Sequence, residues 1–166
     1  MKLLHLPLIL MLLLTSFFFL GCSRNSPITT TVVTTLPNSE SLFNGVASVK
    51  PGESYNVKFT VETSTMLSVA VTGTFQASGG SGNDIKVFIL SDIDYLNWSN
   101  GHSFSALYSS GQLTAGNINS TITKSGTYYL VFSNDFSIIS TKSVTAKIDM
   151  KWSQTVTNTI VTLITQ

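Results

Sequence analysis

The stretch YNVKFTVE at residues 55–62 alternates apolar and polar side chains without a break, and this pattern decides the class of fold. A period of two places alternate side chains on opposite faces of a strand, as in a strand with one buried face. Residues 67–75 and 144–152 repeat the alternation, and the apolar run at 85–90 is typical of a central strand. Because turn residues such as Pro51-Gly52 separate these runs, the sequence predicts an all-β fold, an antiparallel β-sandwich of seven to nine strands.

The composition of the 166-residue chain agrees with this fold and limits the function. Charged residues make up 10% of the chain and the formal net charge is +1, so no basic patch for nucleic acid is expected. Threonine, serine, valine and isoleucine are abundant, which favours strands. The single cysteine, Cys22, leaves no partner for a disulfide within the chain, so the fold depends on its apolar core.

The N-terminus has the features of a secretory signal. Lys2 is followed by an apolar run that closes with Gly21-Cys22. A cysteine directly after the small residue resembles a bacterial lipoprotein signal, which implies cleavage after residues 1–21 and lipidation (palmitate) of Cys22. A retained membrane helix and plain secretion are the alternatives. We therefore expect a cell-envelope protein, held by lipid on the extracytoplasmic side of a membrane.

Residues 22–41 are predicted to be the lipidated cysteine and a tether, and residues 42–166 the globular domain. The tether is rich in serine and threonine and contains Pro27 and Pro37, a composition that resists compact packing. The alternative is a first edge strand over residues 30–36.

The segment 126–134, GTYYLVFSN, followed by Phe136-Ser137 and Lys142-Ser143-Val144, resembles the Golgi-dynamics (GOLD) domain. That resemblance implies a β-sandwich for protein or lipid recognition without catalytic residues. Cargo receptors with this domain usually have a cysteine where this chain has Val131, so their cargo-sorting role is not implied. The residues themselves indicate structural roles: a turn at Gly126, a core tyrosine at 128 or 129 with its hydroxyl on a backbone group, and an Asn134 side chain bonded to its own turn.

Residues 91–117 form the longest predicted irregular stretch, and long loops often carry function. It contains aromatic residues in a Gly/Ser/Asn-rich setting, which suits a binding surface. The candidate binding loop therefore consists of Tyr95, Trp98, His102, Phe104 and Tyr108. The alternative is that these aromatics fold back as a lid over an open end of the sandwich.

The sequence predicts neither a metal site nor a catalytic site. Asp92, Asp94 and Asn97 do not have the EF-hand spacing, so we predict solvated carboxylates and no metal site. No Gly-x-Ser-x-Gly elbow accompanies His102, and no Lys-Ser/Thr pair follows the glycines at 79–82, which predict a hairpin loop. We therefore predict that the chain is not an enzyme and needs no cofactor.

The leading hypothesis is therefore a membrane-anchored extracytoplasmic lipoprotein that acts as a non-catalytic protein-binding or envelope-assembly module. Its expected partners are the membrane, through lipidated Cys22, and an unidentified protein or lipid ligand, with no nucleic acid. The alternative is a carrier of a lipid or small apolar ligand, with the sandwich opening near residues 91–117.

Overall fold

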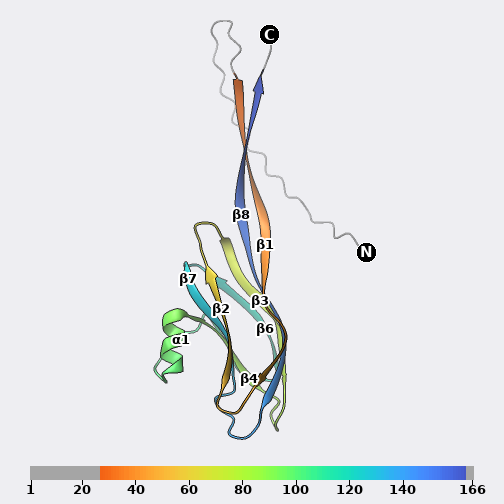
Figure 1. Ribbon diagram of the computed structural model, residues 1–166, viewed down its shortest axis with the longest axis vertical. Helices are drawn as coiled ribbons and strands as arrows, with labels where there is room; N and C mark the ends of the chain where they lie inside the picture. Colours follow the sequence, from red (N-terminus) through yellow and green to blue (C-terminus); the bar gives the residue numbers. More distant parts are fainter. Residues whose placement is uncertain (1–26, 164–166) are drawn as a thin grey trace, which may run out of the picture. The chain divides into compact units, whose positions relative to one another are not determined.

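The computed structural model describes residues 27–163, which form eight strands and one short helix (Figure 1). The predicted signal peptide and Cys22 lie outside these residues. The elements in chain order are β1 (Pro27–Val49), β2 (Ser54–Val61), β3 (Leu67–Ser78), β4 (Ile85–Ser91), α1 (Asp92–Ser99), β5 (Tyr108–Leu113), β6 (Ala115–Ile122), β7 (Gly126–Ser133) and β8 (Lys142–Leu163).

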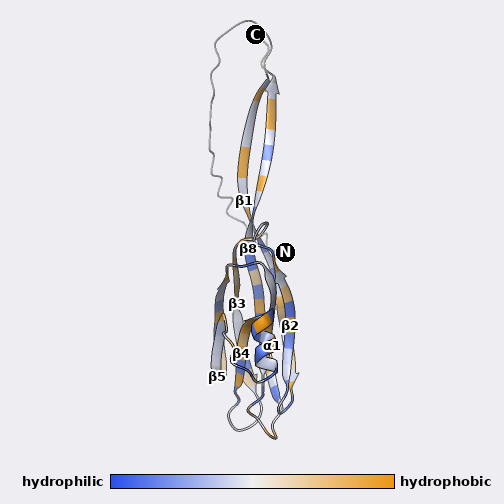
Figure 2. Ribbon diagram, turned by 90° about the vertical axis from the view of Figure 1, so that its left-hand side faces the viewer, coloured by the Kyte–Doolittle hydropathy of each residue, from blue (hydrophilic) through white to orange (hydrophobic). Residues whose placement is uncertain are grey.

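The strands form two antiparallel four-stranded sheets, with the orders β1-β8-β3-β6 and β2-β7-β4-β5. The predicted all-β sandwich is confirmed, and β4 is central, between β7 and β5, as its apolar run predicts. The register of β2 on β7 extends from Ser54↔Ser133 to Val61↔Gly126. Figure 2 shows how hydropathy alternates along the strands.

The main core is built by the side chains that alternation turns inward. In β8, Val144, Ile148 and Met150 are fully buried, whereas Lys147 is exposed and Asp149 is half-buried. Each fully buried aliphatic side chain of this kind stabilises the fold by about 1.5–3 kcal/mol. Strands β3 and β8 approach closely at Gly73, where a Cβ atom would lie 2.2 Å from the carbonyl oxygen of Lys147.

Strand β4 is buried on both of its faces. Ile85, Val87 and Ile89 belong to the main core, while Phe88 and Leu90 belong to a second apolar cluster on the opposite face of the sheet. The apolar run at 85–90, interrupted by Lys86, therefore reflects two separate cores that share one strand.

Two predictions about connections were wrong. The glycine loop at 79–84 is no hairpin, because β3 and β4 belong to different sheets. Residues 91–117 are mostly regular, since they contain α1, β5 and the start of β6. The Ser91 hydroxyl caps α1 by accepting from the Asp94 N–H at 3.2 Å, and the first turn is acidic, which suits the positive end of a helix dipole.

The chain divides into two units. One is the sandwich, Pro37–Ser153. The described part of the other comprises residues 27–36 of β1 and 154–163 of β8, which we call the ribbon. The described part of the predicted tether is thus strand, and the alternative prediction of an edge strand over 30–36 is confirmed, because β1 is an edge of its sheet. The threonines and valines there suit a strand, which explains why residues 27–41 of the predicted tether form part of β1.

Candidate binding site

Of the predicted binding-loop residues, Tyr95 and Trp98 pack in the second apolar cluster, and Phe104 contacts its member Phe88. The Tyr95 ring stacks on that of Tyr129, with ring centroids 3.9 Å apart and an interplanar angle of 10°. Trp98 and Phe104 contact Phe88, with centroid distances of 6.2 and 5.7 Å. These aromatics cover the outer face of sheet β2-β7-β4-β5, so they pack as a layer beneath α1. That they bind a partner stays a prediction.

The other two predicted residues lie apart from this layer. Tyr108 packs against the main core, and its hydroxyl donates to the carbonyl oxygen of Asn117 at 2.9 Å. Burial raises the pKa of the Tyr108 hydroxyl. His102 is exposed, and its backbone N–H donates to the carbonyl oxygen of Asn97 at 2.9 Å.

The carboxylate of Asp94 holds the segment that follows the helix. Its oxygens accept from the Ser91 hydroxyl and, at 2.9 Å, from the Ser105 N–H. These hydrogen bonds, the one from Ser91 above all, hold the pKa of Asp94 below its usual value. In the described part of the chain, no group of three or more acidic, histidine or cysteine side chains is placed to hold a metal ion.

A different loop, residues 134–141 between β7 and β8, is held by hydrogen bonds within itself and to β1. Asn134 is fully buried, and its Nδ2 donates to the carbonyl oxygens of Val49 and Ser140, at 3.1 and 2.8 Å. The Ser137 Oγ donates to the carbonyl oxygen of Ser140 at 3.0 Å and accepts from the Ser140 N–H at 3.1 Å. The loop is therefore closed on itself and tied to β1. The prediction that Asn134 bonds its own turn is confirmed.

Tyr128 also confirms its predicted role. It is buried in the main core, and its hydroxyl donates to the carbonyl oxygen of Lys124 at 2.8 Å. Its neighbour Tyr129 points to the opposite face, under Tyr95.

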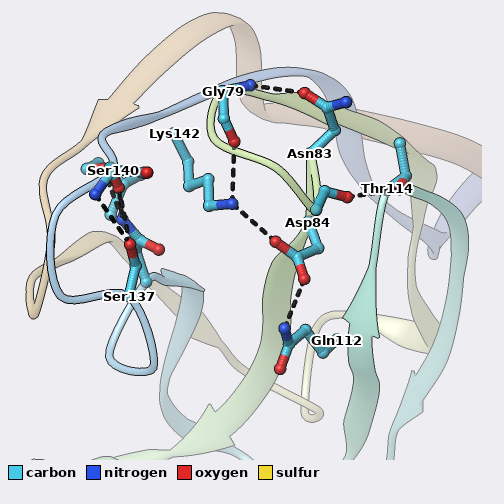
Figure 3. Close-up of polar contacts among 11 residues, drawn as sticks. Gly79, Asn83, Asp84, Gln112, Thr114, Ser137, Ser140 and Lys142 are labelled. Carbon is cyan, nitrogen blue, oxygen red and sulfur yellow. Dashed lines mark hydrogen bonds and ion pairs between the residues drawn. The ribbon is translucent and has the colours of Figure 1, made fainter.

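A buried ion pair ties the start of β8 to the β3–β4 loop (Figure 3). The Lys142 ammonium is nearly fully buried, donates to the Gly79 carbonyl oxygen at 2.9 Å and lies 2.7 Å from Oδ1 of Asp84. The other Asp84 oxygen accepts from the Gln112 side-chain amide. The Gln112 hydrogen bond, followed by Lys142, holds the pKa of Asp84 below its usual value of 3.8. The ring of Phe136 lies 5.7 Å from the Lys142 ammonium, which links the cluster to loop 134–141.

Ile138 and Ile139 are the residues that this loop displays. Their exposed fractions are 91% and 88%, the highest among the exposed large hydrophobic residues of the described chain. Two adjacent exposed isoleucines on an ordered loop form an apolar tip, which we call the Ile138–Ile139 tip. Such a surface gains free energy when a partner covers it. Sequence reasoning missed it, although SIIS at 137–140 places an apolar pair between two serines in a predicted loop.

Two surface hollows lie over sheet β1-β8-β3-β6. The first, of ≈ 580 Å³, is lined by residues of all four strands, among them Val46, Gln76 and Lys147. The second, of ≈ 510 Å³, is lined by β3, β6 and β8. Of residues 91–117, Ala115, Gly116 and Asn117 on β6 line these hollows, whereas no residue of α1 does.

Comparison with known proteins assigns no family. Neither a protein-family model nor a curated protein matches the chain. Among solved structures, one similar chain comes from Bacillus endospore appendages, described as a novel family of disulfide-linked pili. It is 8% identical with a TM-score of 0.36, and the match covers 82% of this chain and 99% of that one. At this TM-score the similarity supports no conclusion. No helix among residues 27–163 is long and apolar enough to cross a membrane.

Proposed function

We propose that the chain is an extracytoplasmic lipoprotein, held on a membrane through lipidated Cys22, whose β-sandwich binds a partner protein and has no catalytic role. The observation that best supports this function is the Ile138–Ile139 tip, because a rigid loop presents two almost fully exposed isoleucines. The lipoprotein-like signal ending at Cys22 supports the anchor. The resemblance to the GOLD domain, used for recognition, agrees with a binding role and remains a prediction.

The chemistry of the tip defines the partner as a protein with an apolar pocket. Covering one exposed isoleucine contributes about 1.5–3 kcal/mol, so the pair offers about 3–6 kcal/mol before the costs of association. The hydrogen bonds of Asn134 and Ser137 already order the loop, so little conformational entropy remains to be lost on binding. Lys86 and Asp135 form an ion pair beside the loop, with 2.9 Å between Nζ and Oδ1, and provide a polar rim.

Site-specific photocrosslinking in cells of the source organism tests the binding surface. A photoreactive amino acid at Ile139 is expected to give one discrete heterologous adduct, and the same probe at Ile93, which is 62% exposed on α1, is expected to give none. The Ile138→Ser change should abolish the adduct formed at position 139, because it removes half of the apolar tip. Equal adducts from positions 139 and 93, or an adduct that survives Ile138→Ser, would contradict the proposal.

Labelling with a fatty-acid analogue tests the anchor separately. The full-length chain is expected to incorporate the label and to sediment with membranes, and Cys22→Ser is expected to lose both properties. Retention of Cys22→Ser on the membrane without label would instead favour a retained membrane helix.

A further inference from the structure

The ribbon is a strand pair with few neighbours among the described residues. The register of β8 on β3 ends at Ser153, so residues 154–163 of β8 have β1 as their one described neighbour. β1 itself is an edge strand. Ile28 and Val33 on one strand and Ile160 and Val161 on the other are each more than half exposed. The ribbon therefore presents apolar side chains to solvent along both strands.

The ribbon also has few of the features that keep strand edges from pairing. Natural edge strands are protected by charged residues, prolines, bulges or short length. Residues 27–36 and 154–163 contain no charged residue, so a second copy meets no like-charge repulsion there. Pro27 and Pro37 lie on β1 at the two ends of this uncharged segment. Because proline cannot donate a ladder hydrogen bond, these residues limit where an added strand can pair.

The sequence of this segment is nearly symmetric about Val32. It reads ITTTVVTT from Ile28, so that Thr29 and Thr35 are equidistant from Val32, as are Thr30 and Thr34. When two identical strands pair antiparallel about a twofold axis, equidistant residues lie opposite each other. In the register centred on Val32, threonine therefore faces threonine twice and Thr31 faces Val33, which are favourable cross-strand pairs.

We propose that a second copy of this chain pairs antiparallel with β1 over Thr29–Thr35, with the twofold axis at Val32. The two ribbons then form one four-stranded sheet, β8-β1-β1-β8, in which the inner edges are paired. An isologous interface requires a self-complementary surface, which this symmetric, uncharged edge supplies. The interaction goes beyond the proposed partner binding, since it uses none of the residues of loop 134–141. Anchoring on a membrane would favour it by raising the local concentration of copies.

Disulfide trapping of the full-length chain in membranes tests this register. In the Val32→Cys variant the two new thiols face each other across the axis, at a separation that a disulfide can bridge. We expect about tenfold more disulfide-linked dimer than in the Ile160→Cys control, whose site is more exposed than Val32 but lies on β8. The parent chain, with Cys22 alone, accounts for any crosslinking through that residue. Val33→Cys should trap much less, because the same register places Thr31 opposite it.

Dimer yields at Val32→Cys no higher than at Ile160→Cys, or higher yields at Val33→Cys, would overturn the proposal. A second variant tests it without crosslinking: Val32→Lys places two like charges at the axis and should abolish the dimer measured by mass photometry, while Val46→Lys on the sandwich part of β1 should leave it intact. Ile138→Ser is expected to change neither readout, so the failure of this proposal and the failure of the proposed function can be distinguished.

Discussion

The two halves of β8 differ in what holds them in place. From Lys142 to Ser153, fully buried residues such as Ile148 alternate with exposed charged residues such as Lys147 and Lys151. From residue 154 onwards the described side chains are uncharged and none is buried. One continuous strand thus passes from a core into a ribbon, and only its first half is specified by burial. A two-stranded ribbon alone is at most marginally stable in water.

The largest expected loss of stability follows from truncating a buried side chain of β8. Ile148→Ala removes a fully buried side chain from the first half of β8 and should lower the free energy of unfolding by about 2–5 kcal/mol. Ile160→Ala, in the ribbon, should change it by less than about 0.5 kcal/mol, because its side chain is already more than half exposed. Urea unfolding followed by circular dichroism measures both. Similar losses for the two variants would contradict the difference between the halves.

The second largest expected loss of stability follows from replacing Lys142, the first residue of β8. Lys142→Met leaves the Asp84 carboxylate without its cation, and we expect a loss of about 3 kcal/mol in unfolding free energy. Part of the cost is relieved by solvent, since the Asp84 side chain is 17% exposed. Lys147→Met, on the exposed face of the same strand, is the matched control and should be nearly neutral. If Lys142→Met left the free energy of unfolding unchanged, the ion pair would contribute little to holding the loops.

A smaller effect is expected in the aromatic layer under α1. Trp98→Ala removes a half-buried ring that contacts Phe88 and Tyr95, and should cost about 1–3 kcal/mol of unfolding free energy. His102→Ala, at an exposed position in the same region, should cost less than about 0.5 kcal/mol. If Trp98→Ala left stability unchanged, the layer would be available for ligand binding, as the binding-loop hypothesis requires.

The smallest effect is a pH dependence. The Gln112 hydrogen bond and Lys142 lower the pKa of Asp84 below 3.8 in the folded chain, so protonation favours the unfolded state. Its contribution is complete above the unfolded pKa and is lost as the pH falls through the folded one. The wild type should therefore lose more stability than Asp84→Asn between pH 6 and about pH 3, in urea titrations at each pH. Parallel losses would mean that Asp84 titrates alike in both states.

Several features of this fold could be predicted because they depend on local pattern. Alternation at 55–62 and 144–152 predicted β2 and β8, and the apolar run at 85–90 predicted a central strand. α1 was not predicted, because its aspartate and asparagine residues are weak helix formers and its hydrophobic residues lie on no single buried face. The cap, with Ser91 followed three residues later by Asp94, was the available signal.

The candidate site was predicted less well, for a physical reason. Aromatic residues in a polar segment are compatible with a binding surface and with a second core, and only the position of Phe88 and Tyr129 on the adjacent sheet shows that Tyr95 and Trp98 pack there. The exposure of Ile138 likewise depends on hydrogen bonds between residues distant in sequence, such as Asn134 to Val49.

The sequence by itself determined the strand class, the inward and outward faces and the lipoprotein-like signal at Cys22, because each depends on neighbours a few positions apart. Only the tertiary structure decided that the β3–β4 loop crosses between sheets, that Lys142 is buried against Asp84, and that residues 27–36 of β1 and 154–163 of β8 belong to a unit distinct from the sandwich. Those features depend on which strands meet in space, and a period-two pattern specifies the faces of a strand without specifying its neighbours.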